Sequence, residues 1–330
     1  MLYDKVILVT GGTGSFGRRF TETVFKNYKP KKLIIFSRDE FKQSEMAKQF
    51  SPSEYPIRYF LGDVRDKQRL DRAFSGVDYV VHAAALKQVP ALEYNPTEAV
   101  RTNVIGAENI VNAAVDAGVK KVIAISTDKA VNPVNLYGAT KLVAEKIFIA
   151  GNVYSDVTRF TVIRYGNVVG SRGSVMPLFL DFKKKGIKQF PITHDQMTRF
   201  WLSLDDGVNL ALRAISEGTG GEIFVPRISS MRITDLAKAI DPECEFKIIG
   251  IRPGEKLHET LISEDESRET CLHNGAYIVL PQFSSGDEAR KKYQNAQKMS
   301  AGFIYRSDIN DQWITREDFQ RIVAQMTEAQ

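Results

Sequence analysis

The regular alternation of short apolar runs with longer amphipathic segments over residues 1–165 constrains the fold most strongly. The runs have strand length and lie at 5–10, 32–36, 57–61, 79–82, 122–125 and 160–165. Between them apolar residues recur at helical spacing, most extensively from about residue 96 to 117. Buried strands joined by helices are typical of a parallel sheet with right-handed crossovers and helices on both faces. The sequence therefore predicts an α/β fold with a doubly wound parallel sheet.

The pattern changes after about residue 166. Helical patterns at 176–185, 204–216 and 233–240 alternate with short strand-like runs at 223–225, 246–251 and 277–280. We expect residues 167–282 to form a smaller α/β lobe over the carboxyl edge of the sheet, with some later segments returning to the domain of residues 1–166. Residues 283–330 begin with a polar stretch, which predicts a loose connector, and end in a capped helix.

Composition excludes several classes of protein. Hydrophobic residues make up 43% and charged residues 26% of the chain, as in soluble globular proteins, and no apolar run reaches membrane-spanning length. The net charge of +5 has one tight basic run, at 183–185, so we expect no nucleic-acid partner. Cys244, Cys271 and the histidines lack metal spacing, so we expect no metal. The first strand follows Met1 closely, so we expect no secretion signal and a cytoplasmic protein.

A glycine-rich loop follows the first strand. Gly11, Gly14 and Gly17 are spaced GxxGxxG between a strand and a helix, where they permit a tight turn and close approach of a pyrophosphate to the helix amino end. Such a pattern alone is a weak signal, and an ordinary strand-to-helix turn is the alternative. Its context favours a Rossmann-like dinucleotide site, whose other predicted contacts in the loop are Thr13, Ser15 and Phe16.

The end of the second strand bears on the choice of dinucleotide. Ser37 and Arg38 follow that strand, and Lys42 is nearby. A guanidinium pairs well with a 2′-phosphate, so these three residues favour NADP over NAD. Asp39 is the counter-argument, because a register shift of two residues would place its carboxylate at the ribose.

Further cofactor contacts are predicted after the third and fourth strands. Asp63 would accept from the adenine amino group, or alternatively cap the following helix. Val64, Ala83 and Ala84 are expected to line the same cofactor site. Lys87 would lie near both nicotinamide and substrate.

The segment from 122 to 146 carries the reactive side chains. Its strand ends in Ser126-Thr127-Asp128-Lys129, at a sheet edge where ligands collect in open α/β folds. Tyr137 and Lys141 are four residues apart on a predicted helix, so the ammonium would lie near the phenol and lower its pKa. The ordinary alternatives are a surface pair on the helix and a solvated loop. The nearby glycine loop favours a catalytic cluster.

The glycine loop together with Tyr137-x-x-x-Lys141 resembles the extended short-chain dehydrogenase/reductase family. Within that family, residues 126–129, 132–133, 135–141 and 252–259 look like the inverting UDP-N-acetylglucosamine 4,6-dehydratases. Those enzymes use NADP and open the route to pseudaminic-acid-type sugars. Their C5-retaining relatives carry Thr-Asp-Glu where this chain has Thr127-Asp128-Lys129, and their tyrosine lies further along. The resemblance therefore implies the inverting branch.

The resemblance implies roles that the chemistry of a 4,6-elimination supports. Tyr137 would take the C4 hydroxyl proton while hydride moves to NADP⁺, and Thr127 would hydrogen-bond the C4 oxygen. Lys129, kept neutral by burial and nearby cations, would then remove the C5 proton. Asp128, kept protonated, would donate to the departing C6 oxygen. Reprotonation of C5 from the other face gives inversion, by a group that the sequence does not identify.

The resemblance also implies a set of substrate contacts. Asn167 would contact the sugar or pyrophosphate, whereas Asn103 belongs to the predicted cofactor site and would tie the long helix to the active-site strand. Arg199 and Arg252 would neutralise the diphosphate. The remaining predicted contacts are Glu255, which would accept from a ribose hydroxyl or orient Arg252, and the uridine-side residues Val175, Pro177, Leu178 and Met197. A UDP-sugar and further copies of the chain, in a dimer or larger homo-oligomer, are the expected partners.

Two other functions stay open at this stage. A nucleotide-sugar epimerase or a C5-retaining dehydratase could use the same scaffold. Asp128-Lys129 argues against a simple 4-epimerase, which needs no acid–base pair for C5 and C6. A cofactor-sensing binding protein is the third possibility, but such proteins commonly lose the tyrosine, which this chain keeps as Tyr137.

Overall fold

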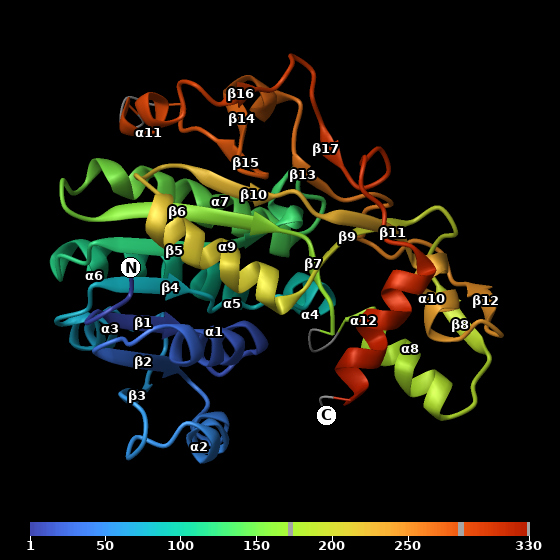
Figure 1. Ribbon diagram of the computed structural model, residues 1–330, viewed down its shortest axis with the longest axis horizontal. Helices are drawn as coiled ribbons and strands as arrows, with labels where there is room; N and C mark the ends of the chain where they lie inside the picture. The colour runs from blue at the N-terminus through green and yellow to red at the C-terminus, as the bar shows by residue number, and fades with distance from the viewer. Residues whose placement is uncertain (171–173, 283–286, 329–330) are drawn as a thin grey trace.

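The protein, represented by a computed structural model, is organised around one large sheet (Figure 1). The structure describes residues 1–170, 174–282 and 287–328. Seven strands of the sheet are parallel, and three more extend it antiparallel. In spatial order the parallel strands are β3 (Ile57–Leu61), β2 (Lys32–Ser37), β1 (Val6–Thr10), β4 (Tyr79–His82), β5 (Lys121–Thr127), β6 (Arg159–Tyr165) and β10 (Ile223–Pro226). The antiparallel strands are β15 (Ala276–Val279), β14 (Thr270–His273) and β16 (Gln297–Lys298).

Helices cover both faces of this sheet, which confirms the predicted fold class. On one face α1 (Ser15–Asn27) packs against α9 (Leu204–Glu217). On the other lie α3 (Lys67–Phe74), α6 (Gly106–Asp116) and α7 (Leu136–Ala150), which pack in that order. The other helices of this part are α2 (Glu40–Gln49), α4 (Val89–Tyr94), α5 (Pro96–Ala99) and α11 (Asp287–Lys292), with the 3₁₀ turns η2 (Asp128–Ala130), η3 (Gly151–Val153) and η4 (Asp265–Glu269).

The long helix predicted at 96–117 is interrupted. A π-helical segment, η1 (Val100–Ile105), separates α5 from α6. It buries Thr102 and Asn103, and Thr102 lines the cavity described below. Local π-helix is rare and is frequently found at functional sites, and apolar periodicity does not detect it.

The smaller lobe has its own apolar core. Its elements are β7 (Asn167–Val168), α8 (Val175–Lys184), β8 (Gln189–Ile192), β9 (Thr198–Leu202), β11 (Ser229–Arg232), α10 (Ile233–Ile240), β12 (Glu245–Ile248) and α12 (Arg316–Glu328). Strands β7, β9 and β11 pair in one small sheet, and β8 pairs with β12. Phe179, Phe190 and Leu236 are fully buried between these elements. A further pair, β13 (Thr260–Ile262) with β17 (Tyr305–Arg306), lies where the lobe meets the main sheet (Figure 1).

Two expectations about the later chain are corrected. The runs at 223–225 and 277–280 are β10 and β15 of the main sheet rather than strands of the smaller lobe, because fully apolar residues such as Phe224 and Ile278 suit a sheet that is covered on both faces. Short strands that contain polar residues, such as β11, were not predicted. The predicted loose connector contains α11, which buries Ala289, although 283–286 lie outside the described residues. The division of the chain at 166 and 282 stays a prediction.

The terminal helix is confirmed. It begins at Arg316, and the Thr315 hydroxyl accepts from the Asp318 backbone N–H at 3.1 Å, as a helix cap does. Among the described residues, no helix has the length and apolarity to cross a bilayer.

Candidate active site

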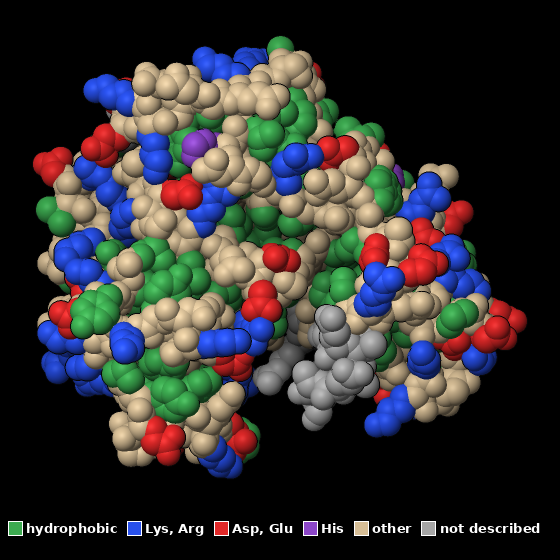
Figure 2. Space-filling model, viewed as in Figure 1, with side chains coloured by type: hydrophobic (Ala, Val, Ile, Leu, Met, Phe, Trp, Pro, Cys, Tyr) green, Lys and Arg blue, Asp and Glu red, His purple; other side chains and the backbone are tan. Residues whose placement is uncertain are grey.

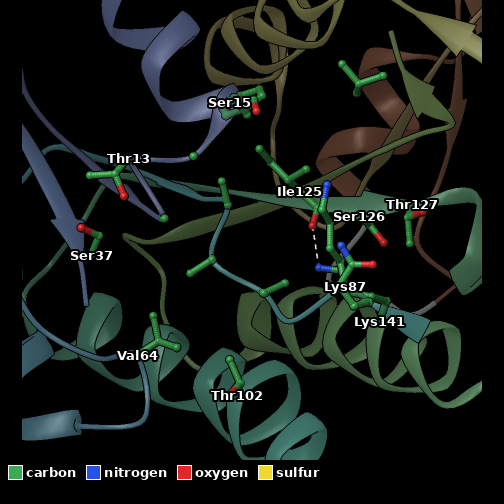
Figure 3. A pocket seen from close by; sticks show the side chains of 18 of the residues that line it. Thr13, Ser15, Ser37, Val64, Lys87, Thr102, Ile125, Ser126, Thr127 and Lys141 are labelled. Carbon is green, nitrogen blue, oxygen red and sulfur yellow. Dashed lines mark hydrogen bonds between the residues drawn. The ribbon is translucent and has the colours of Figure 1, made fainter. Parts of the chain in front are cut away.

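A cavity of about 960 Å³ opens at the carboxyl ends of β1, β4 and β5. The surface is hollowed there, between the body that holds the sheet and the smaller lobe (Figure 2). In the close view, Thr13, Ser15 and Ser37 lie on one side of the cavity, and Lys87, Thr127 and Lys141 on the other (Figure 3). The cavity therefore joins the glycine loop to the reactive segment.

The glycine loop forms one wall of the cavity. Gly11 has φ +64°, and a Cβ there would lie 2.9 Å from the Ala84 backbone nitrogen. Because that space is closed to a side chain, the loop and the chain after β4 approach each other closely. The loop residues that line the cavity are Gly11, Thr13, Gly14, Ser15 and Phe16, and they face Ala83 and Ala84.

Gly17 was predicted to contact the cofactor, but the structure gives it a different role. It does not line the cavity, and a Cβ there would collide with the backbone of Gly12. Its missing side chain instead lets the first turn of α1 pack on the loop, so Gly17 shapes the site without touching its contents.

The end of β2 brings cations to the same cavity. Ser37, Arg38, Asp39 and Lys42 all line it. Asp39 caps α2 by accepting from the Lys42 backbone N–H at 2.9 Å, and its other carboxylate oxygen lies 2.7 Å from Lys42 Nζ. These hydrogen bonds lower the pKa of Asp39, and both of its carboxylate oxygens interact with Lys42. The Arg38 side chain is half exposed at the rim.

Asp63 lies beside this wall but does not line the cavity. Its carboxylate accepts from Arg65 Nη2 at 2.7 Å, whereas Asp66 caps α3. The capping alternative for Asp63 is therefore wrong, because the helix starts three residues later than it requires. Val64 lines the cavity as expected, and the adenine contact of Asp63 stays a prediction.

The acid–base pair lies on η2, directly after β5. Lys129 Nζ donates to Asp128 Oδ1 at 3.0 Å, and the Thr127 hydroxyl donates to the same oxygen at 2.8 Å. Asp128 is fully buried, and within the described residues its Oδ2 has no hydrogen-bond partner. Burial raises the pKa of Asp128, against the pull of Lys129. A buried acid with one uncommitted oxygen can hold a proton for transfer.

The predicted neutral state of Lys129 is wrong for this arrangement. Burial does lower the pKa of its ammonium, but the carboxylates of Asp128 and Glu259 outweigh burial and raise that pKa. Glu259 Oε1 lies 3.3 Å from Lys129 Nζ, and sequence reasoning missed it. The signal was available, because Glu259 ends the 252–259 motif on which the resemblance rests.

Tyr137 and Lys141 both line the cavity from α7, but the expected effect of Lys141 on the phenol is not seen. Burial raises the pKa of Tyr137 to about 12, and the cation that opposes this rise is Lys129. Lys141 Nζ donates to the Ile125 carbonyl at 2.7 Å (Figure 3), and burial lowers its pKa to about 8. Lys141, one helical turn from Tyr137, is therefore not the lysine that lowers the pKa of the phenol; Lys129 is.

Backbone contacts hold α7 in register with η2. A Cβ on Gly138 would collide with the Lys129 carbonyl oxygen, so only glycine permits this approach next to Tyr137. Asn135 caps α7 by accepting from the Gly138 N–H at 2.8 Å, and its amide donates to the Gly254 carbonyl at 2.7 Å. The same cap therefore also ties the 252–259 motif to the site.

Asn103 is structural, but it ties together elements other than those predicted. Its side chain exchanges hydrogen bonds with both backbone groups of Leu86, at 2.9 Å each, and donates to Thr140 Oγ1 at 3.0 Å. It therefore links the π-helical segment to the loop after β4 and to α7, rather than to β5. Its neighbour Thr102 lines the cavity with a buried hydroxyl that has no partner among the described residues, and sequence reasoning missed it.

Asn167 and Lys87, which were predicted to contact the substrate, both line the cavity. The Asn167 Oδ1 and the Ser174 hydroxyl are buried without a hydrogen-bond partner in the described part of the chain, as suits groups that receive a ligand. Burial, with help from Lys129, lowers the pKa of Lys87.

The remaining predicted contacts do not line the cavity. Met197 is 2% exposed in the core of the lobe, so a packing role replaces its predicted contact. Arg199 is buried, and its guanidinium donates to the carbonyls of Leu257 and Lys256 and lies 3.7 Å from Glu255. Arg252 is exposed. On α8, Val175 packs against the core of the lobe, whereas the side chains exposed to solvent are Pro177 and Leu178.

A buried ion network braces the site from behind. Arg164 on β6 is 1% exposed, and its Nη2 lies 2.6 Å from Glu145 on α7 and 3.0 Å from Glu266 on η4. The Ser126 hydroxyl donates to Glu145, so this serine joins β5 to the network instead of merely ending a strand. The network connects the helix of Lys141 with the segment that follows Glu259.

Comparison with known proteins identifies the family. The model of the polysaccharide biosynthesis protein family matches residues 7–281. The chain belongs to this family. With it, the chain is an extended short-chain dehydrogenase/reductase, as the sequence motifs implied.

Several relatives and solved structures are similar to this chain over most of its length. The UDP-N-acetylglucosamine 4,6-dehydratase (inverting) of Campylobacter jejuni serotype O:2 is 52% identical, over 98% of each chain. A UDP-glucose 4-epimerase of Rickettsia canadensis is 46% identical, over 85% of this chain and 84% of the relative. The crystal structure of Pen from Bacillus thuringiensis is similar with a TM-score of 0.90 and 35% identity, over 99% of each chain. DesIV, a dTDP-glucose 4,6-dehydratase from Streptomyces venezuelae, shares the fold at 23% identity and a TM-score of 0.71, over 88% of this chain and 97% of that one.

Proposed function

We propose that the protein is an NADP-dependent lyase. It would convert UDP-N-acetylglucosamine to UDP-2-acetamido-2,6-dideoxy-β-L-arabino-hex-4-ulose, with inversion at C5, as the first step toward a pseudaminic-acid-type sugar. The observation that carries the proposal is the second acid–base pair, with Lys129 Nζ 3.0 Å from the buried Asp128, beside Tyr137. A redox reaction at C4 alone needs no such pair. The Campylobacter relative, named for this dehydration, supports the same reaction.

The residues of the cavity suit a nicotinamide dinucleotide. The glycine loop offers backbone N–H groups at the start of α1, and the close approach at Gly11 leaves that wall flat enough for a pyrophosphate. When bound, NADP⁺ would accept the electrons of the C4–H bond and later return them to C6. Arg38 and Lys42 would hold the 2′-phosphate, while Asp39 stays engaged by Lys42.

The phenol of Tyr137 would act first, as the base for the C4 hydroxyl proton. Its high pKa means that it needs cationic help, which Lys129 supplies. Thr127, which donates to Asp128 at 2.8 Å, would turn toward the C4 oxygen. Lys141, anchored on the Ile125 carbonyl, would keep the floor of the site positive.

Elimination would then use Lys129 and Asp128 in opposite roles. The lysine would take the C5 proton once its own ammonium proton has left, and Asp128 would give its proton to the departing C6 oxygen as water forms. The high pKa of Lys129 predicts that elimination accelerates as the pH rises. Asn167 and Lys87 would orient the sugar, and Arg252 would meet the diphosphate. Cytoplasmic location and homo-oligomeric assembly stay predictions.

The Rickettsia relatives, named UDP-glucose 4-epimerase, favour an epimerase as the second candidate. An epimerase would oxidise and reduce the same C4 carbon and leave the C6 hydroxyl in place. A C5-retaining dehydratase is a further alternative within the lyase class. The fate of C5 and C6 separates all three.

The first prediction tests the reaction itself. We expect the protein, incubated with NADP⁺ and UDP-N-acetylglucosamine in D₂O, to give a 6-methyl signal in the proton NMR spectrum and deuterium at C5. A parallel reaction in H₂O keeps a proton at C5, and the coupling of H5 to H4 after reduction of the ketone would report the inverted configuration. An unchanged C6 hydroxymethyl group would exclude both lyases, and a new C4 epimer would support the epimerase.

The second prediction tests the cofactor. Replacing Arg38 by alanine should weaken NADP⁺ binding about ten- to a hundredfold, because a charged hydrogen bond to phosphate is worth about 1.5–3 kcal/mol. NAD⁺ binding should change little. The matched control is Arg58→Ala, which removes an exposed guanidinium from the neighbouring strand β3 outside the cavity. Equal losses for both cofactors in titrations followed by fluorescence would contradict the assignment of the 2′-phosphate.

A further inference from the structure

Glu259 is a buried carboxylate that neither the sequence prediction nor the proposed reaction uses. It lies directly before β13 and is 2% exposed. Its Oε1 is 3.3 Å from Lys129 Nζ and 3.6 Å from Arg199 Nε. Its Oε2 is buried and has no hydrogen-bond partner in the described part of the chain. A carboxylate this enclosed is costly unless cations compensate it, so its position calls for a reason.

The two carboxylates next to Lys129 come from separate parts of the fold. Asp128 is its sequence neighbour on η2, whereas Glu259 reaches it from the motif that precedes β13. Lys129 thus lies between Asp128, which would donate a proton in the proposed reaction, and Glu259, which has no direct part in that reaction. Glu255, in the same motif, shares Arg199 with Glu259 but forms no ion pair with Lys129, and its side chain is 27% exposed.

The charge balance around Lys129 involves every element packed against it. The negative groups are Asp128 and Glu259, the positive groups are Arg199, Lys256 and Lys87, and Tyr137 is the neutral titratable group. Burial favours the neutral acid of Glu259, but Lys129, Arg199 and Lys256 outweigh it and lower the pKa of that carboxyl. Glu259 therefore stays an anion at neutral pH. An opposite charge at this distance shifts a lysine's titration by about one to three pH units.

We propose that Glu259 is a positioning residue that holds the Lys129 amine between two carboxylates and sets the pH at which it becomes the base for C5. The proposal rests on the proposed dehydration for the role of the base, but the contact itself does not. In the step concerned, the C5–H bond breaks, its proton forms an N–H bond on neutral Lys129, and its electron pair forms the C5=C6 double bond. The C6–O bond breaks with its electrons on oxygen, and Asp128 gives its proton to that oxygen, so that water leaves.

Glu259→Gln tests the proposal. Without the carboxylate, the ammonium of Lys129 is less stabilised and loses its proton at lower pH, so the rise of the dehydration rate with pH should move down by about one to three pH units. Glu259→Asp, which keeps the charge on a shorter side chain, should move it less. Glu255→Gln is the matched control: it removes a carboxylate from the same arginine and should leave the midpoint where it is, whatever it does to the KM.

A second measurement does not depend on turnover. Lysine labelled with ¹³C at Cε, with the Lys129 signal assigned from a Lys129→Ala sample, reports the titration of this amine directly by NMR. In Glu259→Gln its midpoint should fall by the same amount. An unchanged midpoint in the folded variant overturns the proposal, even if the variant is inactive at every pH. If the glutamine variant does not fold, Glu259→Leu, which also lacks the charge, is titrated instead, and a midpoint equal to that of the wild type overturns the proposal. A wild-type protein that dehydrates nothing would remove the proposed function but leave this titration test intact.

Discussion

Replacement of Lys129 by alanine is expected to lower the rate of dehydration by about 10²- to 10⁴-fold, the usual contribution of a positioned acid–base group. The loss should fall on C4 oxidation as well as on elimination, because Lys129 is also the cation that opposes the rise in the pKa of Tyr137. NADP⁺ binding should stay within about twofold of the wild type, because the glycine loop remains and the charge that disappears lies beside the carboxylates of Asp128 and Glu259. The measurement is the rate of appearance of the 6-methyl product, with cofactor affinity determined in parallel.

A surface lysine provides the control for this variant. Lys146 lies on α7 and is exposed, so Lys146→Ala should turn over like the wild type. If Lys129→Ala dehydrates at the wild-type rate, Lys129 is not the base. If it loses cofactor binding as well, the lysine acts through the fold rather than through proton transfer.

Replacement of Arg164 by methionine should reduce the free energy of unfolding by about 3–5 kcal/mol, because removing one partner leaves buried carboxylates without a counter-charge. The guanidinium lies 2.6 Å from Glu145 and 3.0 Å from Glu266, and it is 1% exposed. Urea unfolding at neutral pH measures the loss. The control is Arg268→Met, on the same segment as Glu266, whose side chain is 79% exposed and whose loss should cost little.

The ion pair between Arg164 and Glu266 also makes the free energy of unfolding depend on pH. Arg164 lowers the pKa of Glu266, against the effect of burial, so the wild-type pair adds stability above the ordinary pKa of a glutamate and loses it as the pH falls through the lowered pKa. In Arg164→Met that acid loss should disappear, and the stability gap between variant and wild type should narrow below about pH 4. A gap that stays constant with pH would mean that Arg164 stabilises through packing alone.

The parallel half of the fold could be predicted because its strands are continuous apolar runs. The runs at 57–61 and 79–82 are β3 and β4 without any change of bounds. Several strands of the smaller lobe were missed, such as β9 with the buried Arg199, because the partners that satisfy this side chain lie far away in the sequence. The spacing of apolar residues along the sequence also could not assign β10 and β15 to the main sheet.

The candidate site divides in the same way. Tyr137, Lys141 and the glycine loop were each predicted from a short stretch of sequence, and all three line one cavity. Asp128 does not line that cavity, but it is bonded to Lys129, which does. Charge states and long-range partners are not local. The ammonium of Lys129 depends on Glu259, and the pKa of Tyr137 depends on Lys129, so neither followed from helical spacing. The π-helical segment that exposes Thr102 to the cavity leaves no periodic signature.

The Arg164–Glu266 pair also has a consequence for the order in which the protein is made. The two residues are 102 positions apart, and Glu259 emerges from the ribosome only shortly before Glu266. A nascent chain can form β1 to β6 and the glycine loop well before either glutamate has been translated. During that interval Lys129 faces Asp128 alone. Ribosome-bound chains that end before residue 259 therefore carry an incomplete acid–base cluster, and the cluster is completed only after Glu259 has been translated.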